Sequence, residues 1–344
     1  MKIHYTAEYD PEELKPLYAL GDVQLDGWAL GYPKMSEEEL MRKTADTDII
    51  VTTFDDITRG IIENAKHLRL IACTRATPVN VDLAAAKDRG IPVLYTPGRN
   101  SDATAEHTIG LMLSIARRIP QAHAALKAGR YTAPADEEQK TKDGLRPDVF
   151  WGVGPGAPYS VFKGTQLHGK TLGVIGYGSI GRRVGKIARA IGMALLVYDP
   201  YVGEIDLEEI GVRKAKTLAE TMRESDFISC HLKVTPETEG CISREMLGLM
   251  KPTAYFINAS RSAVVDEDAL IQALRERRIA GAAIDVFAKE PIPKSHPFIT
   301  ELDNVVITPH IAGAAEEVLI NHTRMIVAEI GRFLRGEHLL YEYH

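Results

Sequence analysis

The sequence predicts an α/β protein with two doubly wound parallel-sheet domains. Three observations support this prediction. The chain has 344 residues, which is long for one compact core and sufficient for two. Short β-branched runs alternate with amphipathic helical patterns along most of the chain, as expected of βαβ units on a parallel sheet. The alternation breaks once, near the middle, and resumes from Lys170.

The first part of the chain contains five candidate strands. The helical stretch Ser36–Ala45 begins with Ser36 and has Glu39 three residues later, which is typical of a capping box. Asn80–Arg89, followed by Gly90, predicts a helix that ends at a glycine. The candidate strands are Lys2–Tyr5, Val23–Leu25, Asp48–Thr53, Leu68–Thr74 and Pro92–Tyr95.

The middle of the chain combines a long helix with an irregular segment. Thr104–Lys127 predicts one helix that ends at Gly129. Arg130–Gln166 is rich in proline and glycine and has no period, so we expect an extended surface excursion. A solvated loop is one interpretation of this excursion, and a homodimer contact is the other, because aromatic residues are enriched at interface cores. Its aromatic residues are Tyr131, Phe150, Trp151, Tyr159 and Phe162.

Six further strands with helices between them predict the second sheet. The last helix, about Ala314–Arg335, is long and amphipathic. The strands are Thr171–Ile175, Ala194–Tyr198, Phe227–His231, Ala254–Asn258, Gly281–Val286 and Val305–Thr308.

Composition limits the partners that the chain can have. The 41 Lys and Arg residues against 47 Asp and Glu residues give a net charge of −6, and no run of like charges forms a basic patch. We therefore expect neither nucleic-acid nor membrane binding. The charged start is unlike a signal peptide, and the three cysteines (Cys73, Cys230, Cys241) have neither disulfide nor metal spacing. These features predict a cytoplasmic protein without a metal site.

The strongest motif is Gly176-Tyr-Gly178-Ser-Ile-Gly181, which follows the strand TLGVI and opens a helix. Gly176 permits a tight turn, Gly178 lets the backbone approach a pyrophosphate, and Gly181 allows close packing of helix on strand. The helix N-terminus offers free N–H groups and a positive dipole end to the phosphates. This context predicts a dinucleotide site, whereas an isolated motif of this kind would be weak.

Asp199 ends the next strand and indicates which dinucleotide binds. Its carboxylate would accept hydrogen bonds from the adenosine ribose hydroxyls and would repel a 2′-phosphate. The next residues are Pro200 and Tyr201, not Arg or Lys. The sequence therefore predicts NAD as the cofactor.

Three polar groups also follow strands of the second sheet. They are Asn258–Arg261, Asp285–Pro291 and Thr308–Gly313. Ligands of open parallel sheets bind beyond the carboxyl ends of the strands. We therefore expect all three groups on the edge that binds the cofactor.

At these motifs the sequence resembles the NAD-dependent D-2-hydroxyacid dehydrogenases, most closely their phosphoglycerate dehydrogenase-like branch. The resemblance covers nearly the whole chain. It rests on GYGSIG, VYDP, TPET, INASR, AIDVF with the later EP, and TPHIAG, all in the family's order. It implies a Rossmann-type NAD domain, about residues 104–313, inserted into a flavodoxin-like substrate domain of about 1–103 and 314–344.

The resemblance also implies the catalytic residues. Arg261 matches the arginine that binds the substrate carboxylate, a role that suits a forked guanidinium. His310 matches the general acid/base, and Glu290 matches the carboxylate that orients His310 and favours its charged form. Taken alone, Glu290 reads as a surface carboxylate and His310 as a turn residue. Asp285 matches the acceptor for the nicotinamide carboxamide.

The remaining site residues are implied in the same way. Arg75 stands where the family often has glycine, and with Arg99 it indicates a substrate with a second anionic or polyhydroxy group; a salt bridge is the alternative for Arg75. The expected substrate-binding residues are Arg75, Ala76, Thr77, Arg99, Asn100, Arg261 and His310. The expected cofactor-binding residues are Gly176, Gly178, Ser179, Ile180, Gly181, Asp199, Pro200, His231, Thr238, Ala259, Arg261, Asp285, His310 and Gly313.

Two departures from the family pattern concern the cofactor pocket. Ser262 replaces the usual glycine after Arg261, and Lys233 replaces a frequent proline, where it contacts a phosphate or faces solvent. The expected function is hydride transfer between NAD(H) and C2 of a D-2-hydroxy acid, with phosphoglycerate or a sugar-acid-like compound as candidates. The alternatives are a glyoxylate/hydroxypyruvate reductase and a NAD-sensing corepressor-type binding protein. A formate dehydrogenase-like activity is disfavoured, because that branch of the family has a glutamine at the position of Glu290.

We predict that the protein binds NADH more tightly than NADPH and that Asp199→Ala narrows the difference. The substitution removes the carboxylate that repels a 2′-phosphate. Dissociation constants from cofactor fluorescence would test this. Equal affinities for the two cofactors in the unaltered protein would contradict the role given to Asp199.

Overall fold

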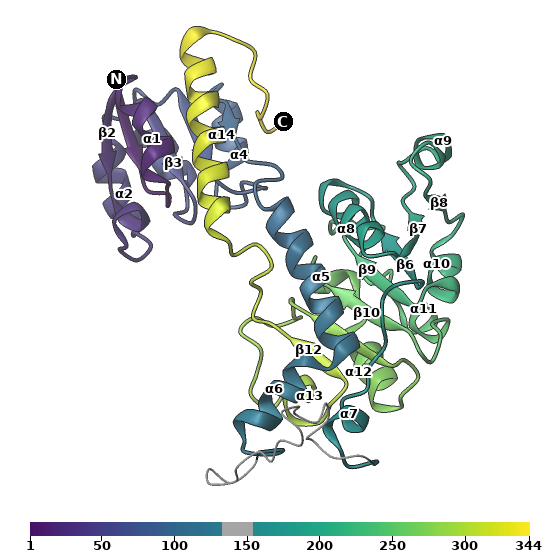
Figure 1. Ribbon diagram of the computed structural model, residues 1–344. Coiled ribbons are helices and arrows are strands. Elements are labelled where there is room, and N and C mark those ends of the chain that lie inside the picture. The colour runs from purple at the N-terminus through teal and green to yellow at the C-terminus, as the bar shows by residue number, and fades with distance from the viewer. Residues whose placement is uncertain (133–153) are drawn as a thin grey trace, which may run out of the picture. The chain divides into compact units, whose positions relative to one another are not determined.

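A computed structural model describes residues 1–132 and 154–344, which form two compact units. Unit 1 comprises Met1–Ala103 and Gly313–His344, and unit 2 comprises Thr104–Ala312. Both are doubly wound parallel α/β structures, so the predicted fold class is confirmed (Figure 1). Phe150 and Trp151 of the predicted excursion lie outside the described residues. No helix in the described ranges is long and apolar enough to cross a membrane.

Unit 1 contains a five-stranded, wholly parallel sheet. Its strand order is β2-β1-β3-β4-β5, which is the flavodoxin-like doubly wound order. All five strands were predicted to within two residues at either end. They are β1 (Lys2–Tyr5), β2 (Asp22–Leu25), β3 (Ile49–Thr52), β4 (Leu70–Cys73) and β5 (Val93–Leu94).

Helices cover both faces of this sheet. Apolar residues of α1 (Pro11–Tyr18) and α14 (Glu316–Arg335) pack on one face, and these two helices lie side by side. The other face packs against α2 (Glu37–Thr44), α3 (Arg59–Asn64) and α4 (Leu83–Asp88), and a short 3-10 helix, η1, spans Gly27–Leu30.

Side-chain caps fix where two of these helices begin. Ser36 accepts a hydrogen bond from the Glu39 N–H at 3.3 Å, as the predicted capping box requires. The helix predicted to start at Asn80 begins at Leu83, because Asp82 caps it by accepting from the Ala85 N–H at 2.8 Å.

A buried carboxylate attaches the segment after α14 to the sheet. Glu329 is 1% exposed and accepts hydrogen bonds from the N–H groups of Leu340 (2.7 Å) and Tyr341 (3.0 Å). The segment then runs antiparallel to β5, where the Tyr343 N–H donates to the Val93 carbonyl at 2.8 Å. The free edge of β5 is thereby paired.

Unit 2 contains a seven-stranded parallel sheet in the order β12-β11-β10-β9-β6-β7-β8. The sequence predicted six of these strands and missed β8, which is only two residues long and forms the edge. The strands are β6 (Thr171–Ile175), β7 (Ala194–Tyr198), β8 (Arg213–Lys214), β9 (Phe227–Cys230), β10 (Tyr255–Asn258), β11 (Gly281–Ile284) and β12 (Val305–Ile307).

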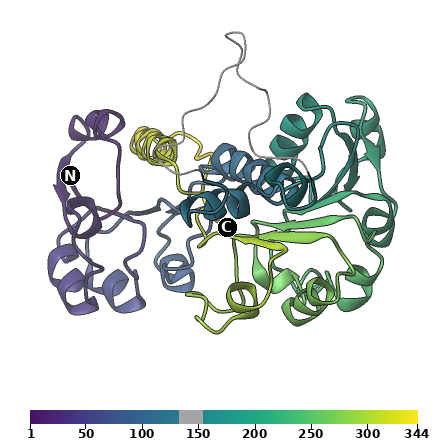
Figure 2. The same cartoon turned by 60° about the horizontal axis from the view of Figure 1, so that its bottom comes forward.

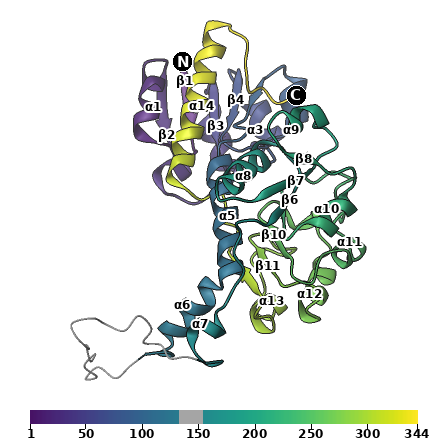
Figure 3. The same cartoon turned by 45° about the vertical axis from the view of Figure 1, so that its right-hand side comes forward.

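The faces of the second sheet carry two separate cores. Residues of α5 and α8 pack on one face, and residues of α10, α11 and α12 on the other, so helices flank the sheet on both sides (Figures 2 and 3). The helices are α5 (Ser101–Arg117), α6 (Ile119–Lys127), α7 (Pro158–Val161), α8 (Ser179–Ala190), α9 (Glu204–Glu208), α10 (Leu218–Glu224), α11 (Arg244–Gly248), α12 (Glu267–Arg275), α13 (Pro297–Thr300) and the 3-10 helix η2 (Ser262–Val264).

The prediction of one helix over Thr104–Lys127 was wrong. The chain breaks into α5 and α6 at Arg118, whose φ of 54° is left-handed. Pro120 has no N–H to donate to the Ala116 carbonyl, and the Thr165 N–H takes that place at 2.9 Å. The break is therefore stabilised by the chain that returns from the excursion.

Candidate active site

The register of unit 2 aligns the ends of six neighbouring strands. Ile307, Ile284, Asn258, Cys230, Ile175 and Tyr198 are successive partners across the sheet. The residues that follow them emerge at one edge, the carboxyl edge of the sheet. They are Thr308, Asp285, Ala259, His231, Gly176 and Asp199. The glycine turn lies where the strand order reverses, which is the usual ligand position in such sheets.

The glycine turn has the geometry of a phosphate-binding loop. Gly176 has a φ of +86°, and a Cβ there would lie 2.8 Å from the His231 carbonyl oxygen. A Cβ on Gly181 would lie 2.2 Å from the Gly176 carbonyl oxygen, so the first turn of α8, which includes Ser179 and Ile180, packs directly on the loop. Gly178 caps α8 without a side-chain bond, and a Cβ added to it would have no neighbouring atom within 4 Å. That open space fits a close approach of a pyrophosphate.

Asp199 joins the glycine turn to the end of β7. Its two carboxylate oxygens accept hydrogen bonds from the backbone N–H groups of Tyr177 (2.7 Å) and Tyr201 (2.8 Å). Asp199 and Pro200 line a cavity of about 340 Å³, to which β8 and the residues after it contribute Lys214 and Lys216. Neither lysine was predicted as a site residue from the sequence, because β8 itself was not predicted.

His231 emerges beside the glycine turn with a neutral ring. Burial lowers the pKa of His231 to about 4. Its Nε2 pairs with the Ser229 hydroxyl at 2.8 Å, and its buried Nδ1 has no partner among the described residues. Thr238 closes the following loop on itself by donating to the Lys233 carbonyl at 2.6 Å. Lys233 is exposed.

Arg261 follows β10 on a turn held by a buried amide. The Asn258 side chain accepts from the Ser260 N–H at 3.0 Å and donates to the Arg261 carbonyl at 3.0 Å. Ala259 is buried between them at 8% exposure. The Arg261 guanidinium donates to the Ser260 carbonyl at 2.7 Å, remains exposed, and pairs with no carboxylate within residues 1–132 and 154–344. It is therefore able to bind an anion.

His310 and Glu290 form a close pair. His310 Nδ1 lies 2.7 Å from Glu290 Oε2, and Glu290 Oε1 accepts from the Phe287 N–H at 3.1 Å. Because a carboxylate only accepts, Nδ1 carries the proton of this bond and Nε2 remains for proton exchange. The His310 side chain is 46% exposed, so a reactant can reach Nε2.

Asp285 holds the turn that carries His310. It is fully buried, and its oxygens accept from the Ile311 N–H (2.9 Å), the Ala312 N–H (2.8 Å) and the Thr308 hydroxyl (2.5 Å). Burial by itself raises the pKa of Asp285, but these bonds and the nearby His107 ring outweigh it, so the pKa is lowered. The structure thus assigns Asp285 a contact with its own chain that the resemblance did not indicate.

The expected substrate residues of unit 1 follow β4 and β5. Ala76 and Thr77 are exposed, and the Arg75 guanidinium lies over the ring of Phe54, 5.3 Å from its centre. Asn100 lies next to Gly313, where a Cβ would be 2.6 Å from its amide nitrogen. Gly313, expected to bind cofactor, thus belongs to unit 1.

Arg99 of unit 1 is held by a buried histidine. His322 Nε2 lies 2.9 Å from the Glu8 carbonyl and therefore donates, so His322 Nδ1 accepts from the Arg99 guanidinium at 3.1 Å. Burial lowers the pKa of His322 to about 4, which keeps the ring neutral. Burial and the nearby charge of Arg75 lower the pKa of Arg99. No carboxylate in the described ranges forms an ion pair with Arg99.

The fold and this edge define a dinucleotide-binding α/β protein with a histidine–carboxylate pair suited to acid/base chemistry. Residues 109–312 match the family model described as D-isomer specific 2-hydroxyacid dehydrogenase, NAD binding domain. The chain belongs to this family. The matched domain confirms NAD as the cofactor, and the open space at Gly178 fits it.

Individual relatives support the same conclusion. The chain is 38% identical to D-3-phosphoglycerate dehydrogenase of Methanocaldococcus jannaschii over 98% of its length, but covers only 58% of that relative. It is 38% identical to glyoxylate reductase of Thermococcus litoralis, over 87% of this chain and 84% of the relative. Apo D-lactate dehydrogenase of Escherichia coli superposes with a TM-score of 0.78 at 27% identity, with full coverage of both chains. The chain thus spans between half and three-fifths of the curated phosphoglycerate dehydrogenases it matches.

We predict that substitution by alanine affects stability at Gly181 and NADH binding at Gly178. Gly181→Ala forces backbone apart and lowers the free energy of unfolding by about 1–3 kcal/mol, less any gain in helix propensity. Gly178→Ala meets no protein atom, changes stability by less than about 1 kcal/mol, and weakens NADH binding because the new Cβ fills the open space. Urea unfolding and NADH fluorescence measure both. A Gly181→Ala variant as stable as the unaltered protein, or a Gly178→Ala variant with unchanged NADH affinity, would refute this account of the turn.

Proposed function

We propose that the protein catalyses reversible hydride transfer between NAD(H) and C2 of a D-2-hydroxy acid. The His310–Glu290 pair is the observation that carries the proposal, because it places an orientated, accessible proton donor on the cofactor edge of unit 2. Bound NADH supplies the hydride. His310 would deliver the proton from Nε2 to the carbonyl oxygen of the 2-keto acid, or take it from the hydroxyl in oxidation.

The other two polar groups have supporting roles in this proposal. Glu290 would hold the His310 ring through Nδ1 and stabilise the charged form by its own charge. Arg261 would bind the substrate carboxylate with the part of its guanidinium that does not contact Ser260. The cofactor contacts expected of Asp199, Pro200, His231, Thr238 and Ala259 are part of the same proposal.

We further propose that the substrate carries a second anionic group, which Arg99 would bind. Arg99 is partly buried and forms no ion pair with the residues that the structure describes, and burial of such a guanidinium costs free energy that an anionic ligand would offset. Phosphoglycerate and sugar-acid-like compounds have such groups or hydroxyls. The alternative is a glyoxylate or hydroxypyruvate reductase, favoured by the fuller coverage of glyoxylate reductase.

NADH oxidation in the presence of a panel of 2-keto acids would test these proposals. Selective turnover of 3-phosphohydroxypyruvate or of a dicarboxylic keto acid would support the second anion. Fastest turnover of glyoxylate would favour the alternative. Binding of NADH without turnover of any member would favour a corepressor-type binding protein.

We predict that His310→Ala and Arg261→Ala each lose most of the turnover and keep most of their NADH affinity. Arg261 follows β10 and His310 follows β12, whereas the glycine turn follows β6. Acid/base assistance is typically worth about 10²–10⁴-fold. Steady-state rates and NADH fluorescence on the same preparations would show this. Near-normal turnover in His310→Ala would refute the mechanism.

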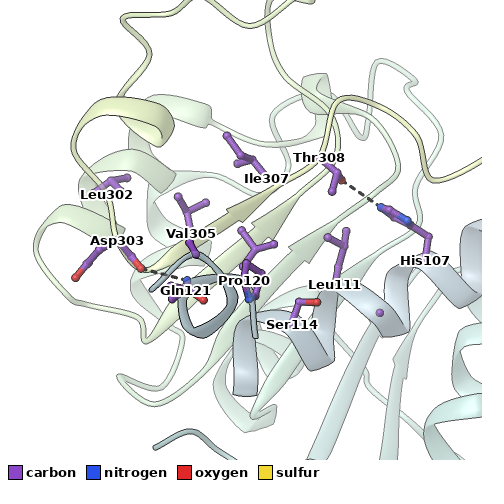
Figure 4. Close-up of a pocket in the computed structure, with 13 residues that line it drawn as sticks. His107, Leu111, Ser114, Pro120, Gln121, Leu302, Asp303, Val305, Ile307 and Thr308 are labelled. Carbon is purple, nitrogen blue, oxygen red and sulfur yellow. Dashed lines mark hydrogen bonds between the residues drawn. The ribbon is translucent and has the colours of Figure 1, made fainter. Parts of the chain in front are cut away.

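We also propose a homodimer that uses α5, α6 and the sheet edge at β12. A cavity of about 640 Å³ lies between these elements and is lined mainly by apolar groups (Figure 4). Leu113, Ile119 and Leu126 of the two helices are 37–52% exposed, so these helices present apolar side chains on their surface. A second copy would cover them.

Light scattering would test the dimer. We predict that the unaltered chain has twice the mass of 37.9 kDa, and that the double variant Ile119→Glu, Leu126→Glu has the mass of one chain. A charge at each apolar position opposes burial in an interface. A monomeric unaltered chain, or a double variant that remains dimeric, would contradict the proposed dimer.

A further inference from the structure

A second histidine contacts the turn that carries His310. His107, on α5, has its Nε2 3.2 Å from the Thr308 hydroxyl (Figure 4). The same nitrogen lies 3.6 Å from Asp285 Oδ1. His107 carries no signal in the sequence, since it lies 178 positions before Asp285 and in no motif of the cofactor edge.

The hydrogen-bond directions around Thr308 follow from the number of protons available. Its hydroxyl has one hydrogen, which it donates to Asp285 Oδ1, because a carboxylate cannot donate. Toward His107 the hydroxyl oxygen is therefore the acceptor. His107 Nε2 therefore carries a proton, and this nitrogen lies 3.6 Å from Oδ1 of the fully buried Asp285 carboxylate.

These contacts bear on His310 because its backbone is strained. His310 has a φ of 56°, a left-handed conformation that is unfavourable for a non-glycine residue. The backbone on its two sides is held by Asp285, through Thr308 before it and through the Ile311 and Ala312 N–H groups after it. Without full engagement of Asp285 the turn would relax and move the His310 ring.

We propose that His107 is a positioning residue for His310. It acts through Thr308 and Asp285, and it contributes no atom to the reaction. This inference rests on the acid/base role that the proposed function gives to His310. The distinction from a merely structural residue is that loss of His107 lowers kcat while cofactor binding and stability are retained.

Two replacements of His107 test the proposal. His107→Leu removes the N–H donor, and we expect kcat to fall about 10- to 100-fold, the cost of a small displacement of a catalytic group, with little change in the dissociation constant of NADH. His107→Gln offers an amide N–H at a similar reach, and we expect it to restore most of the rate. His338→Leu, at an exposed histidine of unit 1, is the matched control and should behave as the unaltered protein.

A second measurement does not depend on activity. Hydrogen exchange at the Ile311 and Ala312 amides should accelerate in His107→Leu and remain slow in His107→Gln. Normal kcat and normal exchange in His107→Leu would overturn the proposal, and so would a glutamine variant no better than leucine. If the unaltered protein reduces no 2-keto acid, the proposed function fails instead, while the exchange rates still decide whether His107 holds the turn.

Discussion

Six parallel strands of unit 2 end in register, and each delivers the next residue of the chain to the same edge of the sheet. The aligned residues are Ile307, Ile284, Asn258, Cys230, Ile175 and Tyr198. A shift of one residue in any strand would turn its following side chain to the opposite face. Strand pairing therefore determines the positions of the glycine turn, Arg261 and the His310 turn more than the local sequence does. The apolar cores on both faces fix that pairing.

Buried polar groups convert this alignment into fixed side-chain positions. Asn258 and Asp285 are almost completely inaccessible, and each uses its side chain to bind the backbone of the turn that follows its own or a neighbouring strand. An unsatisfied buried group of this kind would cost about 1–3 kcal/mol or more. Each turn therefore has one favourable arrangement. The hydrogen bonds that satisfy these two buried side chains therefore also hold the turns at this edge in place.

The sequence was sufficient for the fold class and for most strands, because alternating apolar runs and glycine turns are local signals. It also predicted the Ser36 cap and the pairing of Glu290 with His310, the latter through family resemblance. It failed where structure depends on distant partners. The break at Arg118 depends on Thr165, β8 is too short to have a period, and His107 meets Thr308 only in the folded chain.

The segment after α14 has a consequence for solubility. Strand β5 lies at the margin of the unit 1 sheet, and an unpaired margin offers a row of free N–H and carbonyl groups to any extended chain nearby. Here Tyr341 and Tyr343 occupy those groups, and Glu329 anchors the segment from inside the unit. Because this segment pairs with β5, it opposes edge-to-edge aggregation through that strand. We expect that fusions or deletions that displace this segment increase aggregation of the protein more than they lower its activity.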